Sequence, residues 1–251
     1  MGFLKCVATI HSQQIKLAAA KPEAFLLATQ RGKGMKQEFW LERWERKEIG
    51  FHQDEINPYL REHWPEFQAA GGELFVPLCG KSLDMVWLRE QGHNVLGVEL
   101  SPLAVQEFFA ENGYTPQHTD DGRFKRCEAN GIRLLCGDFF DLTPADMTQV
   151  TAVYDRASLI ALPPEMRERY ARHLVNILPS GTQILLVTVD YPQEEMSGPP
   201  FAVTVEEVEA LYRPYAEIKL LARLDVLAQN PRFQTRGMSR LHENIFVLKL
   251  L

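Results

Sequence analysis

The stretch that decides the fold covers residues 71–88 and reads GGELFVPLCGKSLDMVWL. Residues 73–78 form a short apolar run that follows two glycines and ends at Cys79-Gly80, which is the pattern of a buried strand. After Ser82 the apolar residues recur three to four positions apart, as they do on one face of a helix. The stretch therefore predicts a strand, a tight turn and a helix in direct succession.

The same succession recurs along the chain. Ser101-Pro102 follows the next apolar run and opens a helix, and residues 164–178 predict another helix. Strands joined by crossover helices run parallel, whereas residues 218–227 and 244–250 leave no room for a crossover helix and should pair antiparallel as a C-terminal hairpin. We expect an α/β fold: a Rossmann-like, doubly wound, mostly parallel seven-stranded sheet with helices on both faces. The predicted strands are residues 73–78, 95–100, 132–136, 152–155, 183–189, 218–227 and 244–250.

Two parts of the chain differ in charge. Residues 1–34 carry five basic residues and one acid, whereas the whole chain of 251 residues has a net charge of −6. We expect residues 1–34 to be a weakly ordered N-terminal extension and residues 35–251 to form one domain. A polar stretch around Asp121-Gly122 within this domain predicts a hairpin turn.

Composition argues against several classes of protein. A net charge of −6 without a basic stripe argues against nucleic-acid binding, and no apolar run reaches the 18 residues of a membrane-spanning helix. The four cysteines form no CxxC pair, so we expect reduced thiols, a cytoplasmic protein and no metal site. The 45% hydrophobic and 24% charged residues are typical of an ordinary globular protein.

Ligands of an open parallel sheet bind beyond the carboxyl ends of its strands. Glu99 ends the second predicted strand, 19 residues after Gly80, which is close to the spacing of about 20 residues at which an acid accepts hydrogen bonds from ribose hydroxyls. We therefore expect an adenosine-containing cofactor between this acid and the turn that contains Gly80. The other residues that follow strands are Leu78, Asp138, Phe139, Asp155, Arg156, Asp190 and Tyr191.

The turn lacks the phosphate-binding motifs. Gly80-Lys81-Ser82 resembles the end of a P-loop, but Phe75 stands where that motif requires its first glycine, and the GxGxxG pattern of dinucleotide sites is missing. No GxSxG or HExxH motif occurs, and the seven histidines are scattered, so for each of them we expect a surface or capping role rather than catalysis. An adenosine cofactor without a phosphate cradle points to S-adenosylmethionine.

Seven segments, in order, resemble the thiopurine S-methyltransferase family over about residues 36–251. The resemblance implies a class I methyltransferase that moves a methyl group from S-adenosylmethionine to aromatic or heterocyclic thiols, including thiopurines, and releases S-adenosylhomocysteine and a thioether. It also implies a cytosolic monomer. The segments are FWLERW (39–44), GFHQ (50–53), VPLCGKS (76–82), GVE (97–99), DFFD (138–141), YDR (154–156) and GPPF (198–201).

The resemblance also implies roles for single residues at the cofactor. Trp44 is similar to an aromatic residue that covers the cofactor, and Leu78 to a residue that contacts it through the main chain. Glu99 matches the ribose ligand. Asp138 and Phe139 match the adenine contacts, although relatives differ in side chain at this pair.

On the acceptor side the resemblance implies three residues. Arg156 is similar to an arginine next to both cofactor and acceptor, so it is a cofactor contact and the candidate catalytic residue that favours an anionic acceptor. A structural ion pair with Asp155 or Asp138 is the alternative for this arginine. Phe51 and Arg232 resemble residues of the acceptor pocket.

Other functions remain open from the sequence. The same fold and cofactor serve acceptors such as selenium or tellurium species or another small molecule. A dinucleotide-binding dehydrogenase or sensor uses a similar sheet, but it should retain the GxGxxG glycines that this chain lacks. In each case the expected partner is a small molecule.

Overall fold

The computed structural model describes residues 37–67 and 71–251. The extension predicted for residues 1–34 lies outside the described residues. Everything below concerns the part of the chain that follows it.

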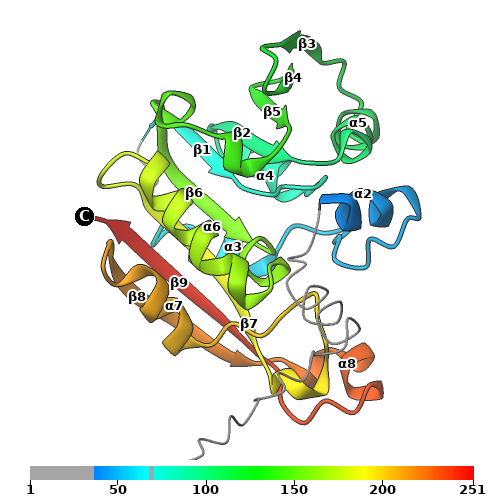
Figure 1. Cartoon of the computed structure of the whole chain (residues 1–251), viewed down its shortest axis with the longest axis vertical. Coiled ribbons are helices and arrows are strands. Elements are labelled where there is room, and N and C mark those ends of the chain that lie inside the picture. The colour runs from blue at the N-terminus through cyan, green and yellow to red at the C-terminus, as the bar shows by residue number, and fades with distance from the viewer. Residues whose placement is uncertain (1–36, 68–70) are drawn as a thin grey trace, which may run out of the picture. The chain divides into compact units, whose positions relative to one another are not determined.

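The described residues form one nine-stranded sheet with the order β3-β4-β5-β2-β1-β6-β7-β9-β8 (Figure 1). The five central strands, from β5 to β7, run parallel. Antiparallel pairs lie at both edges, and β8 and β9 form the predicted C-terminal hairpin. The strands are β1 (Glu73–Val76), β2 (Asn94–Glu99), β3 (Gln117–Asp120), β4 (Lys125–Ala129), β5 (Ile132–Cys136), β6 (Val150–Arg156), β7 (Gln183–Asp190), β8 (Ala216–Asp225) and β9 (His242–Leu250).

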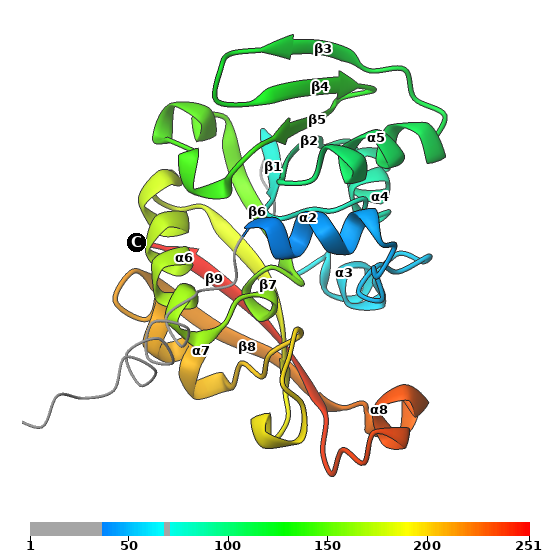
Figure 2. The ribbon, with the colours of Figure 1, turned by 45° about the vertical axis from the view of Figure 1, so that its right-hand side comes forward.

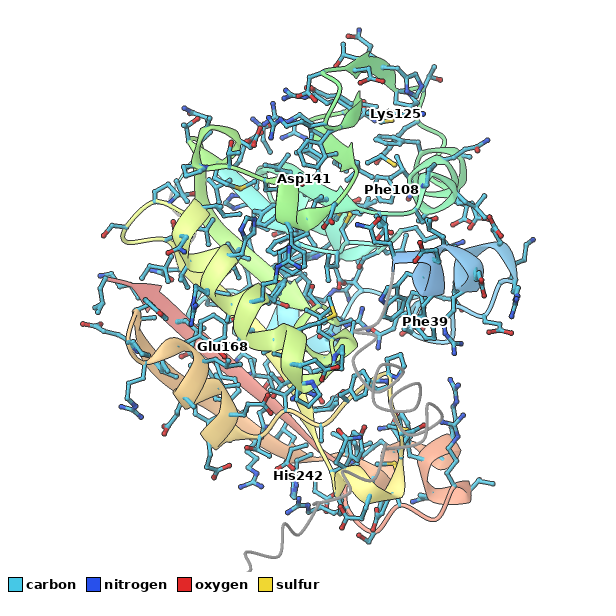
Figure 3. All side chains as sticks on the ribbon, viewed as in Figure 1. Phe39, Phe108, Lys125, Asp141, Glu168 and His242 are labelled. Atoms are coloured by element: carbon cyan, nitrogen blue, oxygen red, sulfur yellow. The ribbon has the colours of Figure 1, made fainter. Side chains whose placement is uncertain are left out.

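All seven predicted strands are present, and β3 and β4 bring the number to nine. These two strands form a hairpin around Asp121-Gly122, where the sequence predicts a turn. Every β3 side chain is exposed, so the hairpin lacks the alternation of apolar and polar residues that reveals a strand in a sequence. Lys125, labelled in Figure 3, belongs to this polar hairpin at the edge of the sheet.

Helices cover both faces of the sheet (Figures 1 and 2). Alternate strand residues point to opposite faces: Leu74 and Val76 pack with α3, α4 and α5, whereas Phe75 packs with α6 and α7. Because the central strands are covered on both sides, they read as continuous apolar runs. The helices are α2 (Gln37–Glu45), α3 (Pro58–His63), α4 (Asp84–Glu90), α5 (Pro102–Glu111), α6 (Pro164–Ile177), α7 (Val205–Tyr212) and α8 (Pro231–Thr235).

Close packing beneath the β1–α4 turn depends on a glycine in β2. A Cβ atom at Gly97 would lie 2.6 Å from Cδ2 of Leu134 and 2.8 Å from Sγ of Cys79. The missing side chain therefore lets the turn after β1 approach β2 and β5. At the end of β2 the chain enters α5, whose first turn is capped by the Ser101 hydroxyl, which accepts from the Ala104 N–H at 3.2 Å.

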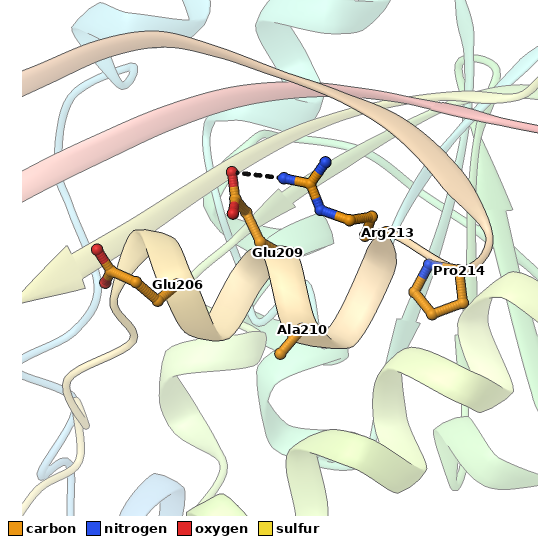
Figure 4. A pocket seen from close by; sticks show the side chains of 5 residues that line it. All are labelled: Glu206, Glu209, Ala210, Arg213 and Pro214. Atoms are coloured by element: carbon orange, nitrogen blue, oxygen red, sulfur yellow. Dashed lines mark ion pairs between the residues drawn. The ribbon is translucent and has the colours of Figure 1, made fainter.

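No helix within residues 37–67 and 71–251 is long and apolar enough to cross a membrane. An open surface depression lies on α7 and the residues that follow it, lined by Glu206, Glu209, Ala210, Arg213 and Pro214 (Figure 4). None of these five residues follows a parallel strand at its carboxyl end. The depression is therefore separate from the site that the fold predicts.

Candidate functional site

The turn after β1 is built from two residues in the left-handed conformation. Leu78 has φ +44° and Gly80 has φ +54°, and the Cys79 N–H between them donates to the Val98 carbonyl at 3.0 Å. The Gly80 N–H donates to Oε2 of Glu99 at 2.9 Å. The turn is thus attached to the end of β2 by one main-chain bond and one carboxylate.

Glu99 is buried, with 6% of its surface exposed, and its carboxylate is held on two sides. Oε1 accepts from the Ser101 N–H at 2.7 Å, while Oε2 accepts from Gly80. Burial raises the pKa of Glu99, and the backbone N–H groups oppose this rise. A carboxylate has about four acceptor positions, so capacity remains for hydroxyl donors such as those of a ribose. The geometry fits the predicted cofactor contact.

Trp44 lies directly against the turn. Its side chain, on α2, is 3% exposed, and a Cβ atom at Gly80 would lie 3.3 Å from Cζ2 of its ring. The ring of Phe51 packs edge-on against Trp44, with centroids 5.7 Å apart. The close approach and the left-handed backbone both favour glycine at position 80.

The other end of α2 reaches the loop after β5. Gln37 Nε2 donates to Oδ2 of Asp138 at 2.6 Å, and Oδ1 of Asp138 accepts from the Phe140 N–H at 2.9 Å. This bond holds one end of α2 and the contact between Trp44 and Gly80 holds the other, so the helix lies across the carboxyl ends of the central strands (Figure 2). Sequence reasoning assigned no role to Gln37, which belongs to no motif.

Phe139 points away from the site. Its ring is 3% exposed and stacks on Tyr170 of α6, with centroids 4.7 Å apart. Only the main chain of Phe139 is therefore placed to contact a ligand at the strand ends.

Arg156 ends β6 and pairs with an acid that the sequence did not suggest. Its Nη1 atom lies 4.0 Å from Oδ2 of Asp84 on α4, and the same carboxylate oxygen accepts from the Tyr154 hydroxyl at 3.0 Å. Among the ion pairs of the described residues, neither Asp155 nor Asp138 is its partner, which corrects that expectation. The carboxylate of Asp84 approaches Arg156 from the helix that follows β1.

Asp155, next to it, is fully buried and accepts from the Tyr170 hydroxyl at 2.7 Å. Burial raises the pKa of Asp155 to about 6. Three residues later the chain is tied back to the β1 turn, since the Ser158 hydroxyl donates to the Pro77 carbonyl at 2.8 Å. Asp155 thus supports the floor of the site.

Arg232 and Phe51 come from distant parts of the chain and lie close together. Arg232 belongs to α8, is exposed, and donates through Nη1 to the Gly50 carbonyl at 3.3 Å. Gly50 immediately precedes Phe51, whose ring also packs edge-on against Trp40 at 5.7 Å. The structure therefore brings the two predicted acceptor residues to one region beside Trp44.

The loop after β7 is fixed by three contacts. The Tyr191 hydroxyl donates to the Pro200 carbonyl at 2.6 Å, and the Phe201 N–H donates to the Ile160 carbonyl at 2.7 Å. The guanidinium of Arg167 lies 5.8 Å from the centre of the Phe201 ring. These contacts hold the GPPF segment near the ends of β6 and β7.

Two residues of the turn are excluded from chemistry. Lys81 Nζ is bound by Glu107 at 2.8 Å and by Glu111 at 2.6 Å, so its charge is neutralised by α5. Cys79 is buried, and burial raises the pKa of its thiol well above the usual value. A protonated, buried thiol is a packing residue and not a nucleophile.

His52 is the other residue of this region that sequence reasoning did not assign. It follows Phe51 directly, and its side chain is 15% exposed. The signal that could have identified it is its place inside the GFHQ segment. Among residues 37–67 and 71–251 no group of three or more histidine, cysteine or acidic side chains could hold a metal ion.

Comparisons with known proteins match almost all of the chain that follows residue 34. A family model described as Thiopurine S-methyltransferase (TPMT) matches residues 35–250. Two relatives called thiopurine S-methyltransferase are 65% identical over 215 residues, in Nitrosospira multiformis, and 51% identical over 217 residues, in Methylococcus capsulatus. These alignments cover 85% and 86% of this chain and 98% of each relative.

Solved structures show the same fold at low sequence identity. Burkholderia thailandensis 1,6-didemethyltoxoflavin-N1-methyltransferase, solved with S-adenosylhomocysteine, is 13% identical, has a TM-score of 0.56, and is matched over 94% of this chain and 93% of its own. A SAM-dependent methyltransferase from Anabaena variabilis is 14% identical, with a TM-score of 0.57 and coverage of 86% and 95%.

Proposed function

Because the chain belongs to the thiopurine S-methyltransferase family and is an S-adenosylmethionine-dependent methyltransferase, we propose that it methylates the sulfur of aromatic or heterocyclic thiols, including thiopurines. The products are S-adenosylhomocysteine and a thioether. The observation that carries this proposal is the juxtaposition of two unlike surfaces at the strand ends. The Gly80 turn with Glu99 forms one, and Phe51 with Arg232, which binds the Gly50 carbonyl, forms the other.

On the cofactor side, each residue has a role that its contacts allow. Glu99 accepts hydrogen bonds from the ribose hydroxyls, and Leu78 contributes its main chain. Asp138 and the main chain of Phe139 contact the adenine, while Trp44 covers the turn and excludes water. When bound, S-adenosylmethionine supplies a methyl group on a positively charged sulfur.

On the acceptor side, the chain orients a thiolate. Phe51 offers an aromatic edge for a flat ring, and Arg232 and Arg156 offer positive charge to an anionic sulfur. Arg156 is the catalytic residue of this proposal because it ends β6, at the edge of the sheet where the ligands are expected, and resembles the family's arginine next to cofactor and acceptor. Alignment of two bound reactants can lower a barrier by about 7–11 kcal/mol, so these residues need to hold and orient rather than react.

Ligand binding tests the cofactor assignment. Thermal unfolding with S-adenosylhomocysteine, NAD and ATP should show stabilisation by the first alone, by about 2.7 kcal/mol at 100 times its dissociation constant. Stabilisation by NAD or ATP without S-adenosylhomocysteine would support the dehydrogenase or sensor alternative.

A methylation screen tests the acceptor. We expect turnover of aromatic thiols, and we expect Arg156→Ala to reduce turnover of an ionised thiol. Selenols and inorganic chalcogen anions belong in the same screen, because methylation of those acceptors in the absence of any thiol turnover would contradict the proposal. Unchanged activity of Arg156→Ala on an ionised thiol would remove its role.

We further propose that the protein works as a cytoplasmic monomer on small molecules, without nucleic-acid or membrane partners. The supporting observations are the net charge of −6 and the described helices, none of which could span a membrane. Light scattering of the purified protein should give the mass of one chain, and a dimer mass would contradict the monomer.

A further inference from the structure

His52 lies at the acceptor side of the site, and none of the roles above uses it. Its neighbour Phe51 packs against Trp44, which covers the Gly80 turn, and the Gly50 carbonyl is bound by Arg232. The three-residue segment 50–52 is therefore held from two sides over the turn. At 15% exposure, the imidazole of His52 is largely shielded from solvent.

Four charged groups from four elements lie near enough to influence the pKa of this imidazole. Lys81 lies in the β1–α4 turn, Arg156 ends β6, Glu111 ends α5, and Asp54 belongs to the same loop as His52. The ring nitrogen Nε2 is 3.7 Å from Oδ1 of Asp54, whose side chain is fully exposed. The imidazole thus adjoins Phe51, which packs on Trp44 beside the Gly80 turn, and it lies within electrostatic range of Lys81 and of the arginine proposed to hold the acceptor sulfur.

The surroundings favour the neutral imidazole. Burial lowers the pKa of His52, and Lys81 and Arg156 lower it further, against the opposing effects of Asp54 and Glu111. A neutral imidazole has one ring nitrogen that can accept a proton. At neutral pH this group is therefore ready to act as a base.

We propose that His52 is a catalytic base that takes the proton of acceptors that arrive as neutral thiols. This inference rests on the proposed function and extends it to thiols that are not ionised at neutral pH. Arg156 and His52 then have complementary tasks. The histidine removes the proton of the acceptor S–H group, and the arginine stabilises the negative charge that develops on the sulfur.

The reaction combines removal of the thiol proton with transfer of the methyl group. The S–H bond of the acceptor breaks, and its proton moves to the free imidazole nitrogen. The electron pair left on sulfur forms the new S–CH₃ bond, while the electron pair of the breaking bond between the methyl carbon and the sulfonium stays on the cofactor sulfur. The imidazolium of His52 loses its proton to solvent before the next turnover.

The pH dependence of kcat/KM distinguishes a built-in base from direct use of thiolate. If His52 removes the proton of the bound thiol, kcat/KM for a weakly acidic thiol is constant between the pKa of His52 and that of the thiol. Without such a base, kcat/KM follows the thiolate concentration and rises tenfold per pH unit over the same range. A merely structural role of His52 would not change this slope.

The experiment compares the full-length parent, His52→Gln and His93→Gln with two acceptors. Phenylmethanethiol is protonated near neutral pH, and 4-nitrobenzenethiol is ionised. His93 is the matched control, because burial lowers its pKa too, while its ring packs on Trp64 at 5.1 Å, away from the turn. Binding of S-adenosylhomocysteine and the unfolding temperature of each variant show whether the fold is intact.

With phenylmethanethiol we expect a flat profile for the parent and for His93→Gln. For His52→Gln we expect a loss of about 100-fold at pH 7 and a slope of tenfold per pH unit. With 4-nitrobenzenethiol all three proteins should agree within about twofold, since no proton has to be removed. A rising parent profile, or an equal loss on both thiols in His52→Gln, would overturn the inference.

A measurement on the parent alone covers the case in which His52→Gln does not fold. The imidazole resonance of His52 should titrate in NMR spectra below the ordinary histidine value of about 6.5, at the pH where the kcat/KM plateau begins. A midpoint above 7 would overturn the inference. A parent that methylates neither thiol would refute the proposed function itself, which is a different result from a rising profile.

Discussion

The cofactor side and the acceptor side of the site are held in opposite ways. Glu99 and Trp44 are 6% and 3% exposed, and backbone N–H groups fix both oxygens of the Glu99 carboxylate. Arg232, by contrast, is exposed and reaches the site through a single 3.3 Å bond to the Gly50 carbonyl. The difference teaches that the proposed cofactor side is preorganised by buried contacts, whereas the proposed acceptor side includes an exposed arginine held by one long hydrogen bond.

The largest effect that we expect concerns the buried floor of the cofactor side. Asp155 has a pKa raised from 3.8 to about 6 by burial, so the folded protein binds its proton more tightly than the unfolded chain does. The stabilisation from that proton is full below pH 3.8 and is lost as the pH rises through 6. The Asp155→Asn variant has no carboxyl group to titrate at this position. The unfolding free energy of the parent, relative to that of the variant, should therefore fall by about 3 kcal/mol between acidic and neutral pH.

Denaturant unfolding of both proteins at several pH values measures this difference. Tyr170→Phe serves as a companion, because it removes the hydroxyl that donates to Asp155 while the carboxyl group remains. A parent-to-Asn difference that does not change with pH would mean that Asp155 is not buried as described.

The second prediction has a smaller effect, and it distinguishes the contacts of Gly80 in the turn from the strain of a left-handed backbone. Gly80 and Gly113 both have positive φ, but a Cβ atom at Gly113 would meet nothing within 4 Å, whereas one at Gly80 would approach Trp44. Alanine at either position should cost about 1 kcal/mol of stability. Only Gly80→Ala should weaken S-adenosylhomocysteine binding, by about tenfold, because it displaces the N–H that holds Glu99.

Calorimetric titration of the two variants checks this prediction. Equal affinities in Gly80→Ala and Gly113→Ala would show that the turn tolerates a side chain, and the contrast between the two sides of the site would weaken.

The smallest effect that we expect lies on the acceptor side. Arg232→Met should raise KM for an aromatic thiol by about fivefold and leave S-adenosylhomocysteine affinity unchanged, since an exposed charge contributes about 0–1 kcal/mol. Arg236→Met is the control on the same surface, because Arg236 contacts Met196 Sδ at 3.7 Å and is not assigned to the acceptor. A change in cofactor affinity in Arg232→Met would contradict the separation of the two sides.

The cofactor side could be predicted from the sequence because its rules are local. A strand, a glycine turn and an acid about 20 residues later predict that Glu99 lies beside the turn, and in the structure the Gly80 N–H donates to its carboxylate. The parallel order of the central strands was also predictable, since crossover helices impose it.

The other contacts of the site join residues that lie far apart in the sequence, and no rule of sequence spacing predicts them. Gln37 meets Asp138 across 101 residues, and Arg232 meets Gly50 across 182 residues. The partner of Arg156 was missed for the same reason, because Asp84 lies on a helix whose orientation is set by packing. The turn of the β3–β4 hairpin was predictable, but its two strands were not, because the exposed side chains of β3 show no alternation of burial.

The central claim is that Glu99 binds the ribose of the cofactor, and one calorimetric cycle tests it most directly. It compares the parent and Glu99→Gln, each with S-adenosylhomocysteine and with an analogue that lacks both ribose hydroxyls. Any loss from disturbing the Gly80 and Ser101 N–H groups affects both ligands equally and cancels. We expect Glu99→Gln to weaken S-adenosylhomocysteine at least about tenfold more than the analogue, as for hydrogen bonds to a charged group. Equal losses for the two ligands would contradict the claim.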